Sequence, residues 1–377
     1  MLECKAFYEV LAEAGVDFFA GVPDSLLKDF CAYVTDHTPA ERNIIAANEG
    51  GAVALAAGHY LATGRPGVVY MQNSGLGNAV NPLTSLADPA VYGIPALLIV
   101  GWRAEPGLKD EPQHVKMGAV TPAVLGAVDV PWAVLPDEIG EARVVVADAL
   151  AAMARDQRPY ALVVKKGTFD KYKLKNKIAA PYPMAREEAI ATMVAAMPSD
   201  ALIVATTGHP SRELYELRER HAQPHDTDFL TVGSMGHSSQ IALAVALEHP
   251  ERTVLCLDGD GAALMHMGGL ATIASLAPRH YKHVVLNNGA HDSVGGQPTC
   301  AFKIDLAGVA RACGYTAAWV ATTQEELAAA WPQFLAAEGP VMLEVRVKTG
   351  AREDLGRPKM TPQDLKRAFM GAIANRG

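Results

Sequence analysis

The chain has 377 residues, of which 50% are hydrophobic and 20% charged, so it can bury the cores of about two globular domains. Its net charge of −8 argues against a nucleic-acid-binding surface, and no apolar run approaches the ~20 residues that cross a membrane. These features predict no nucleic-acid or membrane partner. The five cysteines lack CxxC spacing, which indicates free thiols, and the amphipathic start, MLECKAFYEVLAEAG, does not resemble a signal peptide. We therefore expect a cytoplasmic protein.

Helix-like and strand-like patterns alternate from the amino terminus, which is typical of α/β proteins. The pattern predicts a helix over Glu3–Ala14 and a strand over Asp17–Ala20, followed by a loop that holds Asp24 and Ser25. Either polar residue could cap the next helix or contact a ligand, so both interpretations stay open.

The next two predicted strands end in polar loops. Ile44–Ala47 leads into NEGGAVALAAGHYLATG, a helix rich in small residues that must pack closely against something. Glu49 lies at this junction, where a carboxylate interacts favourably with the helix dipole. Gly67–Gln72 ends in NSGLGN, where Asn73 opens a loop that either binds an anion or simply makes a tight connection.

A long polar segment, GWRAEPGLKDEPQHVKMG, follows the predicted strand Ala96–Val100. We expect a loop here because apolar periodicity is weak, and loops at this end of a strand commonly hold substrate groups in α/β enzymes. His114 could equally be an exposed loop side chain. Lys166, beside the predicted strand Tyr160–Lys165, could reach an anionic substrate.

Residues 169–184 are rich in lysine and proline and predict a linker between domains at 1–168 and 185–377. In the second domain, the strand Ala201–Ala205 ends in TTGHPSR, and Phe229–Val232 ends in GSMGH before an apolar helix. A glycine-containing loop at a helix amino terminus suits a diphosphate group.

The most informative stretch runs from residue 252 to 299. A buried strand, Thr253–Leu257, ends in GDG, a helix is expected over Ala262–Leu276, and a second strand, His283–Leu286, delivers NNG. Asp260 and an asparagine should therefore lie side by side. Oxygen ligands of this kind suit Mg²⁺, which can anchor a diphosphate.

GDG followed by NN at this separation resembles the signature of thiamine-diphosphate-dependent decarboxylases, and NEGGAVALAAGHYLATGRPGVVYMQNSGLGN resembles their pyrimidine-binding domain. The resemblance implies an α/β fold of two doubly wound parallel-sheet domains, pyrimidine-binding and then diphosphate-binding, without a middle domain. It also implies thiamine diphosphate and Mg²⁺ as cofactors, and a homodimer or higher homo-oligomer with active sites between subunits. A nicotinamide-dependent oxidoreductase is disfavoured because no GxGxxG opens a helix with an acidic residue ~20 positions later.

The resemblance assigns roles to individual residues. It makes Glu49 the acid that activates the pyrimidine ring, and Asp260, Asn288 and the Ala290 carbonyl the metal ligands. Asn287 stays an alternative ligand because the spacing is one residue longer than the commonest one. The residues expected to contact the cofactor are Glu49, Asn73, Thr207, Gly208, Gly233, Ser234, Met235, Gly259, Gly261 and Ala262. Met235 would lie beneath the bent cofactor, although a core methionine is the plainer interpretation.

The DEPQH and HDSVGGQPT stretches resemble the branch that acts on pyruvates with a second acidic group at C3, the phosphonopyruvate and sulfopyruvate decarboxylases. The fused chain and KKGTF favour a phosphonate over a sulfonate substrate. His114 and His291 are expected to be catalytic, while His209-Pro210 replaces an expected Lys-Thr and leaves contacts there open. The residues expected to bind the small anionic 2-oxo acid are Asp24, Ser25, Arg103, His114, Lys166 and Ser293.

Overall fold

The computed structural model describes residues 1–177 and 179–374. These residues form two compact units. The first comprises Met1–Lys177 together with Ser293–Pro298, and the second comprises the other described residues.

Six parallel strands form the sheet of the first unit, in the order β2-β1-β3-β4-β6-β5. Their bounds are β1 (Phe19–Gly21), β2 (Asn43–Ile45), β3 (Val68–Gln72), β4 (Leu97–Gly101), β5 (Trp132–Val134) and β6 (Tyr160–Val164). The central strands are buried on both faces, as parallel sheets require, and read as continuous apolar runs.

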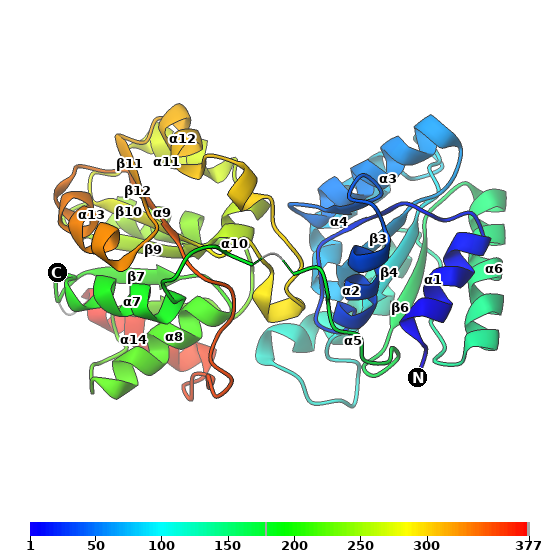
Figure 1. Cartoon of the computed structure of the whole chain (residues 1–377), viewed down its shortest axis with the longest axis horizontal. Helices are drawn as coiled ribbons and strands as arrows, with labels where there is room; N and C mark the ends of the chain where they lie inside the picture. Colours follow the sequence, from blue (N-terminus) through cyan, green and yellow to red (C-terminus); the bar gives the residue numbers. More distant parts are fainter. Residues whose placement is uncertain (178, 375–377) are drawn as a thin grey trace. The chain divides into compact units, whose positions relative to one another are not determined.

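Helices cover both faces of this sheet (Figure 1). They are α1 (Cys4–Glu13), α2 (Lys28–His37), α3 (Glu49–Thr63), α4 (Leu76–Ser85), α5 (Pro112–Ala127) and α6 (Ile139–Asp156). Residues of α1, α2 and α6 join one hydrophobic core, and residues of α3, α4 and α5 join a second.

The second unit also holds six parallel strands, in the order β11-β12-β10-β9-β7-β8. Their bounds are β7 (Leu202–Ala205), β8 (Asp228–Leu230), β9 (Val254–Gly259), β10 (Tyr281–Asn287), β11 (Ala317–Ala321) and β12 (Val341–Arg346). The helices are α7 (Arg186–Ala195), α8 (His209–Arg220), α9 (Ser238–Glu248), α10 (Asp260–Met265), α11 (Gly269–Leu276), α12 (Leu306–Cys313), α13 (Gln324–Ala336) and α14 (Pro362–Ala374). Core residues again divide between the two faces, with α7, α8 and α13 on one and α9, α11 and α12 on the other (Figure 1).

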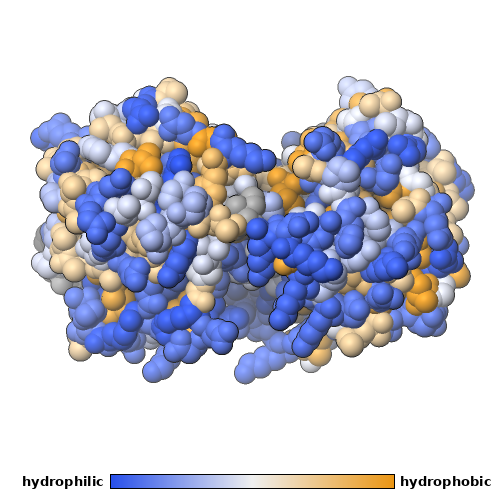
Figure 2. Space-filling view, viewed as in Figure 1, coloured by the Kyte–Doolittle hydropathy of each residue, from blue (hydrophilic) through white to orange (hydrophobic). Residues whose placement is uncertain are grey.

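The predicted fold class is confirmed: each unit is a doubly wound parallel sheet, and the described residues contain no middle domain. Within the described residues, no helix is both long and apolar enough to span a bilayer. On the face drawn in Figure 2, hydrophilic residues are interspersed with scattered hydrophobic ones. Most of the large apolar side chains lie in the cores instead.

Two sequence predictions about elements were wrong, and two edge strands were not predicted. The helix expected over Ala262–Leu276 is two helices: α10 ends at Met265 and α11 begins at Gly269, with Gly268 in the break, and glycine is a poor helix former. The polar segment after β4 is not a loop throughout, since α5 begins at Pro112, a residue well suited to a first helical position. The edge strands β5 and β11 were missed because they are short and mostly half-buried, which leaves a weak apolar pattern.

The start of the segment predicted as a linker packs on the first unit. Phe169 lies in its core and bridges to Leu2, and the main-chain N–H groups of Lys175 and Asn176 donate to the Asp36 carboxylate. The lysine-rich run up to this point is therefore tied to α2 through its backbone, while its lysine side chains are mostly exposed.

Candidate active site

Polar side chains follow the carboxyl ends of five neighbouring strands in the first sheet. They are Glu49 after β2, Asp24 and Ser25 after β1, Asn73 after β3, Arg103 after β4, and Lys165 and Lys166 after β6. Ligands of open α/β sheets bind at this edge, so the fold places most of the expected first-unit residues where a site would form.

Glu49 is the first residue of α3 and is only 6% exposed. The helix begins here because Asn48 caps it, accepting a hydrogen bond from the N–H of Gly51 at 2.8 Å. Glu49 Oε2 accepts from Asn78 Nδ2 at 2.7 Å, and a β-carbon on Gly75 would lie 2.5 Å from Oε1. A carboxylate that served only the helix dipole would be expected to face water, whereas this one is enclosed by the NSGLGN segment.

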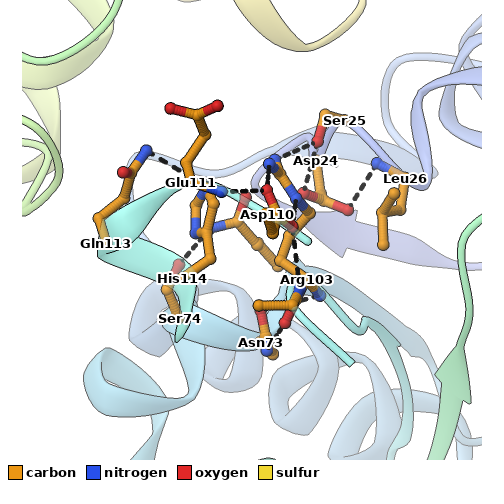
Figure 3. A network of polar contacts seen from close by, with 12 residues as sticks. Asp24, Ser25, Leu26, Asn73, Ser74, Arg103, Asp110, Glu111, Gln113 and His114 are labelled. Atoms are coloured by element: carbon orange, nitrogen blue, oxygen red, sulfur yellow. Dashed lines mark hydrogen bonds and ion pairs between the residues drawn. The ribbon is translucent and has the colours of Figure 1, made fainter. Parts of the chain in front are cut away.

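Arg103 is held in place by two partners (Figure 3). Its Nε and Nη2 donate to the Asp110 carboxylate at 2.8 and 2.5 Å, and its Nη1 donates to Ser25 Oγ at 2.8 Å. Burial lowers the pKa of Arg103, but the hydrogen bond and charge of Asp110 outweigh it, so the pKa is raised. The same hydrogen bonds hold the pKa of Asp110 far below its usual value. The guanidinium is therefore a fixed cation.

Asp24 is fully buried beside this pair, and burial raises the pKa of its carboxyl. Its Oδ2 accepts from the N–H of Leu26 at 2.9 Å, and a β-carbon on Gly101 would lie 2.2 Å from Oδ2. Neither Asp24 nor Ser25 caps α2, because that helix begins at Lys28 without a side-chain cap. The capping interpretation is wrong, and ligand contact is the alternative that stays open.

Asn73 and His114 differ from their expected settings. The amide nitrogen of Asn73 donates to the Arg103 carbonyl at 3.0 Å and to Thr121 Oγ1 at 2.9 Å, so this side chain braces neighbouring segments of the protein. His114 does not lie in a loop but in the first turn of α5, where it is buried, with Nε2 3.5 Å from Gln113 Nε2.

The expected lysine is exposed. Lys166, after β6, is exposed. Lys165 Nζ instead pairs with Glu105 Oε1 at 2.5 Å and lies 5.9 Å from the centre of the Trp102 ring. Ser293 is also exposed.

In the second sheet, β9 and β10 are parallel neighbours, with Leu286 opposite Gly259. Asp260 and Asn288 therefore emerge side by side, as the sequence predicts. Asp260 is buried, accepts from Thr299 Oγ1 at 2.5 Å, and has a pKa raised to about 6 by burial. Ala290, two residues beyond Asn288, is 9% exposed.

The two asparagines are used differently. Asn287 is completely buried, and its Nδ2 donates to Glu344 Oε1 at 2.8 Å while its Oδ1 accepts from Gly289 N–H at 3.0 Å. Asn288 donates from Nδ2 to Asp292 Oδ2 at 2.6 Å, and its Oδ1 accepts from Ala290 N–H at 3.1 Å.

Glycine-rich turns line the rest of this edge. Gly208, directly before α8, has φ +96°, and the loop before α9 contains Ser234 at φ +49° and Gly236 at φ +86°. Ser234 is exposed and Met235 half-buried, so Met235 is not a fully buried core residue. Thr207, Gly208, Gly233 and Gly259 are also half-buried, and Ala262 is buried.

Gly261 lies where Met235 and His291 meet. A β-carbon on Gly261 would lie 3.3 Å from Met235 Cε and 3.0 Å from the His291 ring. Burial lowers the pKa of His291 to about 4, so the ring is neutral at pH 7.

This donor set fits a magnesium diphosphate. Asp260 is a buried carboxylate with an amide oxygen beside it, and hard cations prefer oxygen ligands of this type. Thr206 Oγ1, directly after β7, is buried and has no hydrogen-bond partner within the described residues, so one donor is left unused there. The amino termini of α8, α9 and α10 lie at the same edge, where free N–H groups attract anions.

Several partners of these residues were not identified from the sequence: Asn78, Asp110, Asp292 and Thr299. All four lie inside the polar segments that the sequence analysis singled out. No spacing rule pairs them with Glu49, Arg103, Asn288 or Asp260. Asn78 and Thr299 lie far along the chain from their partners, whereas Asp110 and Asp292 meet theirs through the conformation of a single loop.

Two family models match the chain. The "Thiamine pyrophosphate enzyme, N-terminal TPP binding domain" matches residues 4–121, and the corresponding C-terminal TPP binding domain matches residues 206–345. Together they cover both units.

Similar curated proteins span nearly the whole chain. A phosphonopyruvate decarboxylase of Streptomyces viridochromogenes is 40% identical over 96% of this chain and 93% of its own. A second, of Streptomyces hygroscopicus, is 40% identical over 98% of this chain and 93% of its own. A sulfopyruvate decarboxylase of Methanosarcina acetivorans is 29% identical over 96% of this chain and 95% of its own. The chain therefore belongs to the thiamine pyrophosphate enzyme family, among its 2-oxo acid decarboxylases.

Proposed function

We propose that this protein catalyses the non-oxidative decarboxylation of 3-phosphonopyruvate to phosphonoacetaldehyde and CO₂, with thiamine diphosphate and Mg²⁺ as cofactors. The observation that carries the proposal is the 40% identity to two phosphonopyruvate decarboxylases across both units. Supporting it, Glu49 and Asp260, one in each unit, are both buried at the carboxyl edge of their sheets.

Asp260, Asn288 and the Ala290 carbonyl would hold the metal. The loops with Thr207, Gly208, Gly233 and Ser234 would hold the diphosphate through main-chain N–H groups. When bound, thiamine diphosphate supplies a carbon nucleophile and accepts the electron pair that CO₂ leaves behind. Glu49 would hold a proton at a ring nitrogen, a task for which its position against Asn78 fixes the carboxylate.

The substrate groups would meet fixed donors. Arg103 is a cation whose guanidinium carries five N–H donors, and only some of these bond Asp110 and Ser25. A charge-assisted hydrogen bond contributes about 1.5–3 kcal/mol. Around the segment that holds Arg103 lie Asp24, Ser25 and His114. The proposed substrate-binding set is completed by Lys166, His291 and Ser293.

We also propose a homodimer or higher homo-oligomer. The outward face of α3 carries exposed small residues and Leu61, which is 71% exposed. A surface hollow of about 450 Å³ on this face is lined by Phe18, Ile44, Gly51, Ala54, Leu55, Gly58 and His59. A second copy of the chain would bury this apolar face close to Glu49, which starts the same helix.

We place the enzyme in the cytoplasm because all five cysteines are unpaired. A reducing compartment keeps thiols in this state.

Sulfopyruvate decarboxylation is the second candidate. It is supported by the 29% identical sulfopyruvate decarboxylase, which also aligns over nearly the whole chain. The two substrates differ at the C3 acid, so the same donor set could accept either.

The test uses enzyme freed of metal and cofactor by chelation and dialysis. We expect release of CO₂ and phosphonoacetaldehyde from phosphonopyruvate only after thiamine diphosphate and Mg²⁺ are both restored. Turnover in the chelated enzyme without additions would contradict the cofactor assignment. Failure to turn over phosphonopyruvate with both present would contradict the substrate.

A further inference from the structure

We propose that Asp292 is a positioning residue that fixes the amide of Asn288 for metal binding, and that the buried Arg186–Glu213 pair holds Asp292 in place. The inference rests on the proposed function, since it concerns the metal that the function requires. It adds three residues to the site, none of which would touch the metal.

An asparagine amide has two ends, and only its oxygen can bind a cation. Asn288 Nδ2 donates to Asp292 Oδ2 at 2.6 Å, a short bond to a charged acceptor. The reversed amide would place its oxygen against the carboxylate and be repelled. The contact with Asp292 therefore fixes which end of Asn288 carries the oxygen, and Oδ1 keeps a lone pair beyond its bond to Ala290 N–H.

The neighbouring Asn287 is committed elsewhere. Its nitrogen bonds Glu344 on the adjacent strand β12, and its oxygen bonds Gly289 N–H within its own turn. Both ends of this amide stabilise the strand end, and the side chain is completely buried. The structure thus favours Asn288 over Asn287 as the side chain offered to a metal.

Asp292 needs support of its own, because a carboxylate this close to a cation would otherwise turn toward it. Two groups hold it back. The N–H of Gly350 donates to Asp292 Oδ2 at 2.8 Å, and Arg186 Nη1 lies 3.7 Å from the same oxygen. Arg186 Nη2 also donates to the Gly350 carbonyl at 3.4 Å, so the two groups that hold Asp292 also contact each other.

Arg186 is oriented by Glu213. Its Nε and Nη2 donate to the two carboxylate oxygens at 2.8 and 2.9 Å, and both side chains are buried. A buried pair of this kind gains little net stability, because desolvation offsets the attraction. Its use here is to fix a cation behind Asp292, and through Asp292 the amide of Asn288.

The same unit contains a matched control. Arg218 donates from Nε and Nη2 to Asp228 at 2.9 and 3.0 Å, another bidentate pair with a fully buried carboxylate. Arg218 lies on α8 and Asp228 on β8. Breaking this pair should destabilise the unit about as much as breaking Arg186–Glu213, but within residues 1–177 and 179–374 neither Arg218 nor Asp228 bonds Asp292 or Asn288.

The experiment measures Mn²⁺ affinity by electron paramagnetic resonance on the full chain with saturating thiamine diphosphate. We expect Asp292→Ala to weaken Mn²⁺ binding about 10–100-fold, the usual range for residues that orient a metal ligand. Asp292→Asn should weaken it less, because the amide oxygen can still accept from Asn288. The loss of Mn²⁺ affinity in Glu213→Gln should lie at the low end of this range, and Asp228→Asn should bind Mn²⁺ as the wild type does.

Three results would overturn the inference. Wild-type affinity in Asp292→Ala would remove the positioning role. A loss as complete as in Asp260→Ala would make Asp292 a direct ligand. An equal loss of Mn²⁺ affinity in Asp228→Asn and Glu213→Gln, at equal thermal stability, would mean that the Arg186–Glu213 pair only stabilises the fold. A wild-type enzyme that binds no Mn²⁺ under these conditions would instead overturn the proposed function, and the inference with it.

Discussion

The first sheet runs β2-β1-β3-β4-β6-β5, and the second, read from its opposite edge, runs β8-β7-β9-β10-β12-β11, which is the same order of strands. The carboxyl edges nevertheless differ. The first offers charged side chains held by partners, such as Glu49 against Asn78 and Arg103 against Asp110. The second offers glycine turns, helix amino termini and the buried carboxylate of Asp260 at the start of α10.

The difference teaches that the topology fixes where a site forms and the loops fix what it does. Fixed side chains suit proton transfer and recognition of an anionic substrate. Main-chain N–H groups and oxygen ligands suit a diphosphate with its metal. The substitutions at Asp260, Glu49, Asp110 and Arg103 each disturb one of these functions in one unit.

The largest effect is expected from Asp260→Ala, which removes the anionic ligand of the second unit. The variant should lose metal-dependent retention of thiamine diphosphate, because the diphosphate charge is then poorly compensated. Cofactor remaining after gel filtration measures this. The matched control is Asp305→Ala, which removes a carboxylate at the start of α12 that accepts from Gly308 N–H. Retention equal to wild type in Asp260→Ala would rule out this residue as a ligand.

Glu49→Gln should separate the two units' functions. The amide keeps the shape but cannot exchange a proton, so we expect cofactor binding near the wild-type level and kcat reduced about 10²–10⁴-fold. Exchange of the cofactor's C2 hydrogen, followed by NMR, reports the step directly. Exchange at the wild-type rate would leave Glu49 as an ordinary residue of the helix start.

Mixing the two inactive variants tests whether one site draws on two subunits. In a symmetric dimer, random assembly of Glu49→Gln with Asp260→Ala chains should restore about a quarter of wild-type activity, because half the molecules carry one intact composite site. Activity is assayed after joint refolding or subunit exchange. No recovery despite confirmed mixed dimers, or an active monomer on a sizing column, would contradict the shared site.

A smaller effect is expected from the fixed cation of the first unit. Asp110→Asn frees Arg103 from its charged partner, and Arg103→Lys removes the fork that bonds both Asp110 and Ser25. We expect each to lower kcat/KM about 10–100-fold, the equivalent of one charge-assisted bond, mainly through KM. Exposed Asp137→Asn serves as the control. Unchanged KM in both variants would remove Arg103 from the substrate set.

The smallest effect concerns the amino-terminal end of strand β10, at the end of the second sheet away from the site. Lys282 on β10 donates to the Ala337 carbonyl, and burial lowers its pKa to about 8 from an ordinary 10.5. The unfolded chain therefore binds more protons between pH 8 and 10.5, and wild-type stability should rise with pH there. Lys282→Met should be more stable by about 1–3 kcal/mol at pH 7, a gap that closes toward pH 10.5. Denaturant unfolding measures it, and a gap that is constant with pH would contradict the shifted pKa.

Much of this arrangement could be predicted from the sequence. Buried apolar runs ending in glycine and polar residues predicted both sheets, and they predicted that Asp260 and Asn288 would be neighbours, because parallel strands end at one edge. The helix start at Pro112 was missed because polar residues surround it, so His114 was expected in a loop. The contacts of Asp110 and Asp292 with partners only 7 and 4 positions away were not predicted, because no fixed spacing pairs such side chains within a loop, and the contact of Thr299 with Asp260 joins residues 39 positions apart.

The central claim is tested most directly by comparing kcat/KM for phosphonopyruvate, sulfopyruvate and pyruvate in one preparation with thiamine diphosphate and Mg²⁺. A phosphonate carries one more charge than a sulfonate at neutral pH, and a single charge-assisted bond corresponds to about tenfold or more. We predict that phosphonopyruvate is preferred at least about tenfold over sulfopyruvate, and both well over pyruvate. A ratio that favours sulfopyruvate, or turnover of pyruvate equal to either, would contradict the phosphonate assignment.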